Sequence, residues 1–347
     1  MAQPDADPAG FIQSMCGWDC GWYVKMAETG YDPYPVPSRI NAGNWAFFPF
    51  YPLLVGAIRL LLPFPTIVTA TLVSLLVSYT AAVVAWPLFE RDLRAFTLYA
   101  AYLLAGPFAF YFTTFLTEPM FVLTMTVVFV MLKRSNYFAA GLATIFLSAT
   151  RIVGVFAALS LILQAALDHR DRTGSWRGLI AAFLMRPNLL LAIFIAPLGA
   201  FAYMAFLYFY IGDGLAFQHV QRAWARPFGN PVFFVWQGLT SWPSQGLWPT
   251  SSQWLALAAV IGIALTIVLA VRRQWAQALF AAIALILPLF AGLASVIRFT
   301  SAMVPIVVLA ARLLAARRWL FWLSLIGILV LGYVIPLAWL DGNVALA

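Results

Sequence analysis

The chain has 347 residues, of which 64% are hydrophobic and 9% are charged. Because a soluble globular domain carries about 25% charged residues, this composition excludes an ordinary water-covered domain and favours helices packed in lipid. The formal net charge of +8 comes without a basic stripe on a soluble face, so we expect it to orient membrane helices and predict no nucleic-acid partner.

The chain opens with a polar segment. Residues 1–10 have neither a basic n-region nor an apolar h-region, so no cleavable signal peptide is predicted. Cys16 and Cys20 then flank Trp18 and Asp19. The two cysteines form a disulfide if the segment faces an oxidising compartment, and two unpaired thiols are an equal alternative. No His or further Cys lies nearby, which argues against a zinc site.

Long apolar runs dominate the rest of the sequence. Residues 45–62 are aromatic and interrupted by Pro, which indicates an interfacial or partly inserted segment. Since each crossing needs about 20 apolar residues, there is room for about nine to eleven membrane segments, and the predicted fold class is an all-α, polytopic transmembrane helix bundle. Spans are predicted at residues 66–87, 95–112, 116–132, 137–166, 188–211, 252–271, 275–293, 299–316 and 319–340.

Two stretches are not typical of a single regular span. Residues 137–166 are too long for one upright span and are interrupted by Thr150, Arg151 and Gly154. They form either one tilted helix or two short helices that meet at Arg151. Residues 228–250 are rich in Pro, Gly and Trp, which indicates an interfacial loop with a short helix.

The basic residues divide the loops into two sets. One set carries most of the Lys and Arg and is cytoplasmic by the positive-inside rule. Its basic residues are Arg91, Arg94, Lys133, Arg134, Arg170, Arg172, Arg177, Arg186, Arg272, Arg273, Arg312, Arg317 and Arg318. The opposite, extracytoplasmic face then receives residues 1–65, the turns at 112–117 and 294–298, and residues 212–250.

This topology predicts the domain organisation and the localisation. Residues 1–347 form a single integral-membrane domain, with a catalytic extracytoplasmic and interfacial loop at 1–65 and a first group of transmembrane helices at 66–211. A second extracytoplasmic loop follows at 212–251, and C-terminal transmembrane helices occupy 252–347. The composition is compatible with a multi-pass protein of a bacterial inner membrane, and the charge bias of the loops predicts that residues 1–65, with the active site, face the periplasm.

An acid among aromatic residues is the strongest local signal. Asp19 lies between Trp18 and the pair Trp22 and Tyr23. In one interpretation it is the N-cap of a helix over residues 20–28 in a loop on the membrane surface. In the other it is a carboxylate that acts as a base on an acceptor hydroxyl, between aromatic walls that hold a sugar.

Three more charged residues on this face have both structural and functional interpretations. Glu118 lies at the outer end of a span, where it either stabilises the helix start beside Pro119 or works in a water-filled cavity. Arg151 lies inside an apolar stretch and needs a partner, for which Glu118 and Asp213 are candidates. Arg298 either anchors a helix end at the headgroups or belongs to the site.

Six segments resemble a known family in residue type and in order. They are Trp18 to Tyr31 (W-D-x-x-W-Y-x-x-x-A-x-x-G-Y), Asn44 to Pro52 (N-W-A-F-F-P-x-Y-P), Thr117 to Phe121, Ala139 to Gly154, Gly212 to Trp224, and Ser295 to Phe299. Together they resemble the PIG-V-like mannosyltransferases, which are membrane glycosyltransferases of the GT-C class related to the second mannosyltransferase of GPI-anchor synthesis. The likeness runs over residues 17–310.

The resemblance implies a GT-C-like fold and a reaction. A sugar, mannose by the family likeness, moves with inversion from a polyprenyl-phosphate-linked donor to a lipid, glycan or protein acceptor on the extracytoplasmic side. The family's base is an acid in the first outside loop, here Asp19, and arginines would suit the phosphate of the leaving lipid. The substrate-binding residues predicted on this basis are Trp18, Trp22, Tyr23, Asn44, Glu118, Arg151, His219, Arg222 and Arg298.

The sequence departs from the family in two places. Family members usually have a membrane helix before the Trp–Asp motif, whereas only about fifteen residues precede it here. Gly214 stands where the family favours Pro. We predict no metal and no cofactor, because no cluster of ligands is visible and the lone His219 is a poor metal signal, although two acids can recruit a divalent cation without a sequence signature.

Two other functions compete with the enzyme. A transporter or flippase of a lipid-linked precursor would use Arg151 and Glu118 as charges along a pathway, but no internal repeat of broken helices is visible. A non-catalytic subunit of a membrane complex is the third hypothesis. It predicts that Asp19, Arg151 and Arg298 do not converge.

Overall fold

The computed structural model describes residues 16–35, 42–224, 228–241 and 251–340. Within these ranges the chain forms helices and no β-strand, in agreement with the predicted all-α class. In the described part of the chain, five helical stretches are long and apolar enough to cross a membrane, which is typical of an integral membrane protein. They are Thr66–Val84, Ile152–Thr173, Pro187–Ile211, Ser252–Val271 and Arg318–Leu337.

The helices follow one another with short connections. The α-helices are α2 (Cys20–Thr29), α3 (Phe50–Arg59), α4 (Thr66–Val84), α5 (Leu93–Ala105), α6 (Ala109–Thr113), α7 (Glu118–Lys133), α8 (Tyr137–Thr150), α9 (Ala157–Thr173), α10 (Leu179–Leu184), α11 (Pro187–Ile195), α12 (Leu198–Ile211), α13 (Ala216–His219), α14 (Pro231–Thr240), α15 (Ser251–Val271), α16 (Trp275–Leu289), α17 (Val296–Ser301), α18 (Val304–Ala315) and α19 (Arg318–Leu340). Short 3₁₀ helices lie at η2 (Asn44–Ala46), η3 (Trp86–Phe89), η4 (Ile152–Phe156) and η5 (Val220–Trp224).

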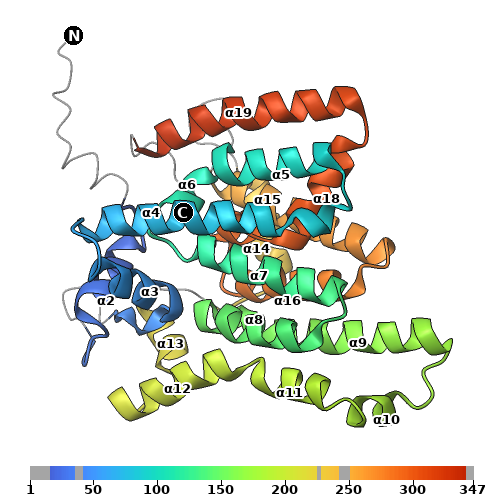
Figure 1. The fold of residues 1–347 in the computed structure, drawn as a ribbon. Coiled ribbons are helices and arrows are strands. Elements are labelled where there is room, and N and C mark those ends of the chain that lie inside the picture. The colour runs from blue at the N-terminus through green and yellow to red at the C-terminus, as the bar shows by residue number, and fades with distance from the viewer. Residues whose placement is uncertain (1–15, 36–41, 225–227, 242–250, 341–347) are drawn as a thin grey trace.

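The helices stack as roughly parallel rods. Figure 1 shows α19 on one side, followed by α5, α4, α7 and α8, with the row α12–α11–α10 on the other side. Helix α7 lies in the middle, packed between α4 and α8, and is apolar around most of its circumference. A helix that is apolar all round belongs in an interior. The first residue of α7, Glu118, therefore enters the packed interior of the bundle.

Residues 137–166 form two helices, which confirms one of the two expected arrangements. Helix α8 ends at Thr150, and Arg151 has extended backbone angles (φ −152°, ψ 142°) before η4 and α9. Gly154 lies against the backbone of Leu147 so closely that a Cβ atom would come within 2.4 Å of the Leu147 carbonyl oxygen. The interruption therefore folds the chain back on itself and leaves Arg151 at the bend.

Several expected spans are divided where Gly or Pro interrupts the apolar run. The segment 95–112 becomes α5 and α6, separated at Gly106, and the segment 188–211 becomes α11 and α12, separated at Pro197. The segment 299–316 becomes α17 and α18, because Pro305 occupies the first turn of a new helix. In the segment 45–62 the α-helix is confined to α3, after the 3₁₀ helix η2. The segment 228–250 contains the expected short helix, α14, and residues 242–250 lie outside the described residues.

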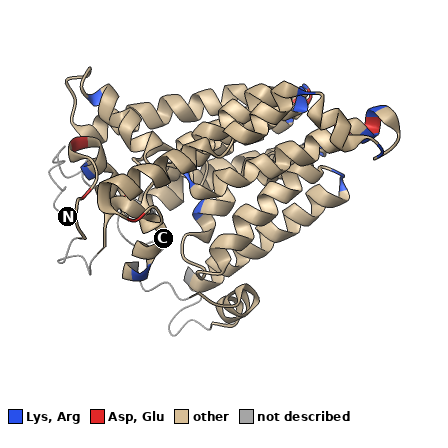
Figure 2. Ribbon diagram, turned by 90° about the horizontal axis from the view of Figure 1, so that it is seen from below, with Lys and Arg blue, Asp and Glu red and all other residues tan. Residues whose placement is uncertain are grey.

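The ends of the rods collect the charges. At one end, Glu90 between α4 and α5 pairs with Lys133 at the end of α7 and with Arg312 of α18. At the same end, Asp168 of α9 accepts hydrogen bonds from Ser135 and Tyr137. Figure 2 shows that the lengths of the helices between the two ends carry few charged residues. We call the end that holds Glu90, Lys133 and Asp168 the basic end. The end that holds α2, the start of α7 and α17 is the acidic-loop end.

Candidate functional site

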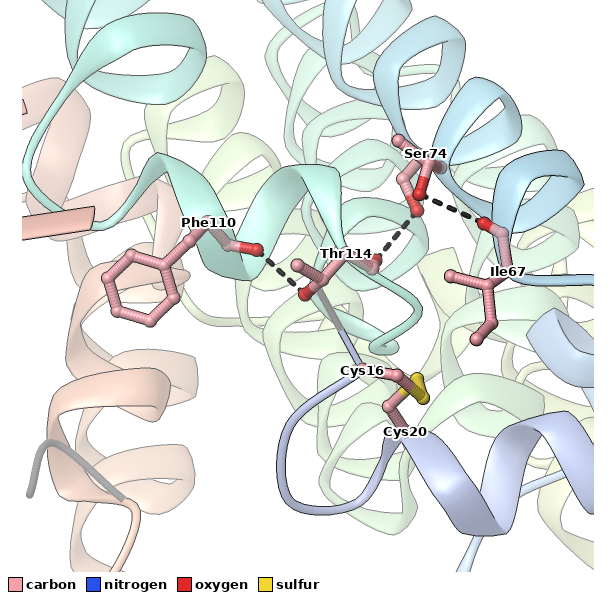
Figure 3. The surroundings of a disulfide bond; sticks show 7 residues. Cys16, Cys20, Ile67, Ser74, Phe110 and Thr114 are labelled. Carbon is pink, nitrogen blue, oxygen red and sulfur yellow. Dashed lines mark hydrogen bonds between the residues drawn. A yellow bond between two sulfur atoms is a disulfide. The ribbon is translucent and has the colours of Figure 1, made fainter. Parts of the chain in front are cut away.

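A small covalent loop holds Asp19 in place. Cys16 and Cys20 form a disulfide across Trp18 and Asp19, which decides between the two alternatives left by the sequence. Figure 3 shows the disulfide beside the turn after α6, near Thr114. Trp18 adopts a positive φ of 52°, a conformation that is unfavourable for a bulky side chain and that the closed loop helps to maintain.

Asp19 has the position of a helix cap but its side chain does not cap the helix. Its backbone carbonyl accepts from the N–H groups of Trp22 and Tyr23 at the start of α2, as the capping interpretation predicts. Its carboxylate makes no capping hydrogen bond. The Oδ2 atom instead accepts from Nη1 of Arg298 at 2.6 Å.

Arg298 joins the N-terminal loop to the bundle interior. It lies on α17, and its side chain is 6% exposed, so it is not an anchor in the headgroup layer. Its Nη1 contacts Asp19, and its Nε donates to Oε1 of Glu118 at 2.8 Å. One planar guanidinium therefore connects two carboxylates, a geometry for which Arg is well suited.

Glu118 has a second arginine partner. Its side chain is fully buried, and Oε1 also accepts from Nη2 of Arg151 at 2.5 Å. The Nε of Arg151 donates to Oγ1 of Thr117 at 3.0 Å. Asp19, Arg298, Glu118 and Arg151 thus form a continuous chain of alternating charge, which we call the acid–arginine cluster. The predicted pairing of Arg151 with Glu118 is confirmed.

Aromatic rings surround the two guanidinium groups. The Arg151 guanidinium carbon lies 5.3 Å from the ring centre of Phe121 and 5.0 Å from that of Phe299. The Arg298 guanidinium carbon lies 6.0 Å from the ring centre of Tyr111. Trp18 in turn lies 5.9 Å from Tyr111, centre to centre. These contacts provide cation–π stabilisation to the two guanidinium groups.

Sequence reasoning did not select three of these aromatic residues as site residues. Phe121 and Phe299 lie within the segments that resemble the family, directly beside or one turn from a charged residue, and this proximity was the available signal. Tyr111 lies on α6, in a run of similar aromatic residues, and nothing in the sequence distinguishes it from its neighbours. Its role becomes visible only when α6 and α17 are brought together.

The cluster contains polar atoms that are not satisfied within the described part of the chain. Oε2 of Glu118 and Nη1 of Arg151 are buried and have no hydrogen-bond partner there. Leaving a buried polar group unpaired costs about 1–3 kcal/mol, and more when the group is charged. Such atoms commonly mark the position of a bound water or of a ligand.

The predicted residues Trp22, Tyr23 and Asn44 lie in the scaffold behind Asp19. Trp22 and Tyr23 are buried against Phe47, with ring-centre distances of 6.0 and 5.1 Å. Asn44 is fully buried and fastens two turns, because its Oδ1 accepts from the N–H of Asp32 and its Nδ2 donates to the carbonyl of Gly30. These contacts fix the orientation of α2.

Tyr23 is also electrostatically coupled to the cluster. Burial raises the pKa of its hydroxyl well above the ordinary value, and the neighbouring Asp19 carboxylate raises it further. The hydroxyl consequently remains protonated at neutral pH and can act only as a neutral group. Tyr23 is therefore suited to orienting a neighbour and unsuited to acting as a base.

The predicted residues His219 and Arg222 lie on a separate, exposed segment. His219 Nδ1 lies 2.7 Å from Oδ2 of Asp213, and the hydrogen bond with His219 lowers the pKa of Asp213. Arg222 follows on η5, which packs near η2, and no described contact joins it to the acid–arginine cluster. Arg226, a nearby arginine that would also suit the phosphate, lies outside the described residues.

Among the residues that the structure describes, no group of three or more His, Cys, Asp and Glu side chains could hold a metal ion. The chain matches no protein-family model, no curated protein and no solved structure. Over the described ranges of the chain, the fold and the site define a helical protein with five membrane-length helices and a largely buried acid–arginine cluster at one end. Its function has to be argued from this cluster.

Proposed function

We propose that the chain is a membrane glycosyltransferase with a GT-C-like arrangement. It moves a sugar, mannose by the family likeness, from a polyprenyl-phosphate carrier to a hydroxyl group of a lipid, glycan or protein acceptor. The observation that carries the proposal is the contact of Asp19 with Arg298 at 2.6 Å, which connects the N-terminal loop to the buried Arg298 and, through Glu118, to Arg151. The segments that carry Asp19, Glu118, Arg151 and Arg298 are the same segments that resemble the PIG-V-like family.

Asp19 has a free oxygen with which to act as the base. Its Oδ2 is engaged by Arg298, whereas no described residue donates to Oδ1, and the side chain remains 30% exposed. An acceptor hydroxyl becomes nucleophilic as its proton leaves, and a positioned carboxylate can take that proton. Asp19 is the acid of the cluster with this access, since Glu118 is fully buried.

The reaction would balance as a direct displacement. The acceptor oxygen forms a bond to the anomeric carbon while its proton passes to Oδ1 of Asp19. The bond from the anomeric carbon to the phosphate oxygen breaks, and the electron pair stays on the lipid phosphate. Because the acceptor attacks opposite the leaving phosphate, the anomeric configuration is inverted.

The charge of the cluster suits this reaction. In the resting protein two carboxylates balance two guanidinium groups, which allows Glu118 and Arg298 to be buried while Asp19 and Arg151 stay partly exposed. When Asp19 takes a proton, the cluster gains one net positive charge. The leaving phosphate gains one negative charge in the same step, and Nη1 of Arg151 is a buried donor without a described partner that can face it.

Membrane placement follows from the separation of the two ends. We propose that the basic end faces the cytoplasm and the acidic-loop end faces the periplasm of a bacterial inner membrane. A polyprenyl-phosphate donor would then present its phosphate at the level of Arg151 while its chain remains in the bilayer. A disulfide at Cys16 and Cys20 supports this orientation, because disulfides persist in oxidising compartments.

The convergence of Asp19, Arg151 and Arg298 weighs against a purely non-catalytic subunit. Such a subunit needs no exposed carboxylate beside these arginines, and burying the charges of Glu118 and Arg298 without a task carries a large desolvation cost. A transporter would also use buried charges. It differs from the enzyme because it would move the lipid-linked sugar without breaking the bond to phosphate.

The test is transfer by the Asp19→Asn variant. The protein is assayed in membranes with radiolabelled polyprenyl-phosphate mannose, and both transferred label and released polyprenyl phosphate are measured. We expect a loss of about a hundredfold or more, as for removal of a general base. Asp171→Asn, at the exposed C-terminal end of α9, is the matched control and should retain full transfer.

Two outcomes would contradict the proposal, and a third would correct its donor. Normal transfer by Asp19→Asn would exclude Asp19 as the base. Movement of the intact donor across vesicles without release of polyprenyl phosphate would favour a transporter. Transfer of glucose or another sugar in place of mannose would leave the mechanism intact and correct the donor alone.

A further inference from the structure

A hollow at the basic end is independent of the acid–arginine cluster. It has a volume of about 470 Å³, and two arginines, Arg172 of α9 and Arg186 before α11, contribute to its wall. Asn136, Tyr137 and Asn188 add polar groups from the starts of α8 and α11. The volume is within the usual range of pockets for small molecules, about 300–1,000 Å³.

The two arginines have capacity to bind an anion. Nε of Arg172 donates to the backbone carbonyl of Asp168 at 2.9 Å, which leaves the outer nitrogens of the guanidinium group unused by that bond. Neither Arg172 nor Arg186 forms an ion pair with any described residue. Two guanidinium groups on one hollow are the arrangement by which proteins hold phosphate bidentately.

No described acidic residue lines the hollow, and Asp168, one turn before Arg172 on α9, is engaged by other side chains. Both carboxylate oxygens of Asp168 are engaged, because Oδ2 accepts from Ser135 and Tyr137 and Oδ1 accepts from Gln164. The hydrogen bonds of Asp168 therefore hold α9 against the start of α8. The two arginines therefore give the lining of the hollow a net positive charge.

The neighbouring helix places the hollow at a bilayer surface. None of the six residues of α10 is buried, and Ile180 and Leu184 are 77% and 66% exposed, with Met185 at 82% just after the helix. Apolar side chains exposed to this extent are stable where they enter the acyl region of a membrane. Trp176, with Arg170 at 5.3 Å from its ring centre, is typical of the headgroup level.

We infer that the hollow lined by Arg172 and Arg186 binds the phosphate of an anionic phospholipid headgroup, with α10 lying in the membrane surface beside it. The ligand chemistry is a phosphate diester joined to a small polar headgroup and to acyl chains. The acyl chains would run past the exposed apolar residues of α10. The two arginines contact the phosphate, and Asn136 and Asn188 can donate to the headgroup.

The experiment uses the full-length protein in detergent micelles and native mass spectrometry. The probes are dioleoylphosphatidylglycerol, dioleoylphosphatidylcholine and inorganic phosphate, the last to distinguish a free anion from a lipid. The test variant is the double substitution Arg172→Gln and Arg186→Gln. The matched control is Arg272→Gln and Arg273→Gln, which removes the same charge from the turn between α15 and α16, outside the lining of the hollow.

We expect the wild type to retain phosphatidylglycerol and the test variant to bind it about tenfold more weakly, which corresponds to about 1.4 kcal/mol. The control variant should change by less than about twofold, since exposed charges act mainly through screened, non-specific attraction. An equal loss in both variants would overturn the inference in favour of general charge attraction. Binding of inorganic phosphate with the affinity of the lipid would overturn the lipid as the ligand, as would equal binding of phosphatidylcholine.

Discussion

Both ends of the bundle contain ion pairs, but the pairs differ in burial. At the basic end, Glu90 pairs with Lys133 although their side chains are 66% and 36% exposed. At the acidic-loop end, Glu118 is 0% exposed and Arg298 is 6% exposed. The exposed pair can exchange its partner for water, whereas the buried pair cannot. The difference indicates that the Glu90–Lys133 pair is a surface ion pair and that the Glu118–Arg298 pair is a fixed part of the interior.

The largest expected effect comes from removing the central acid. Glu118→Leu leaves two buried guanidinium groups without their common partner, and breaking a buried pair in this way costs about 3–5 kcal/mol. The thermal stability of the purified protein should fall accordingly. Glu90→Leu, the matched change at the exposed pair, should cost less than about 1 kcal/mol. Equal losses in the two variants would remove the distinction between the ends.

The next effect concerns the arginine that joins the two acids. Arg298→Lys keeps the charge but replaces a planar fork by a single ammonium group, which cannot span Asp19 and Glu118 in the same geometry. If the proposed function is correct, transfer should fall by about tenfold to a hundredfold while the protein remains folded. Lys133→Arg at the exposed pair provides the control. Undiminished transfer by Arg298→Lys would show that the bridging geometry is unimportant.

A smaller effect is expected from opening the disulfide. The replacement of Cys16 and Cys20 by Ser removes a disulfide between cysteines that are 4 positions apart. In the chain-entropy model, the loss of a disulfide that closes so short a loop lowers the free energy of unfolding by about 2 kcal/mol. The consequence should be local, since Trp18 and Asp19 would gain freedom while the bundle stays packed. Limited proteolysis of the N-terminal segment checks this. Unchanged cleavage would mean that packing against Phe110 and Tyr111 suffices to order the loop.

The smallest effect is a pH dependence at the basic end. The hydrogen bond from Lys133, followed by that from Arg312, lowers the pKa of Glu90 below its ordinary value of 4.5. Because the pKa of Glu90 is lower in the folded protein than in the unfolded chain, the ion pair stabilises the fold fully at a pH above the unfolded-state pKa. This stabilisation is lost as the pH falls through the folded-state pKa. Glu90→Gln should therefore be slightly less stable than the wild type at pH 7, and the difference should shrink as the pH falls below 4.5 and vanish below the folded-state pKa of Glu90. A constant difference across this range would contradict the ion pair.

Much of the helical framework could be predicted from the apolar runs, because burial in lipid requires a run of minimum length. The bend at Arg151 was also predictable, since Thr150, Arg151 and Gly154 interrupt an otherwise apolar stretch. Helix boundaries were less predictable. The start of α18 at Val304 depends on how Pro305 is accommodated after α17, which is a tertiary property.

The sequence allowed most charged residues of the site to be predicted, but not the contacts between distant ones. Intramembrane charges are costly, so Glu118 and Arg151 stood out and their pairing could be anticipated. The contact of Arg298 with Asp19 joins residues 279 positions apart, and no local pattern encodes it. The role of Tyr111 could not be predicted either, because it depends on the position of its ring against the Arg298 guanidinium group.

The separation of Asp19 and Arg298 along the chain has a consequence for synthesis in the cell. Asp19 and Glu118 emerge from the ribosome long before α17, so neither acid can meet Arg298 until most of the protein has been made and inserted. During that interval Arg151 is the only arginine of the cluster present to neutralise Glu118. Ribosome-stalled chains that end before α17 should accordingly remain loosely assembled and be accessible to membrane quality-control proteases.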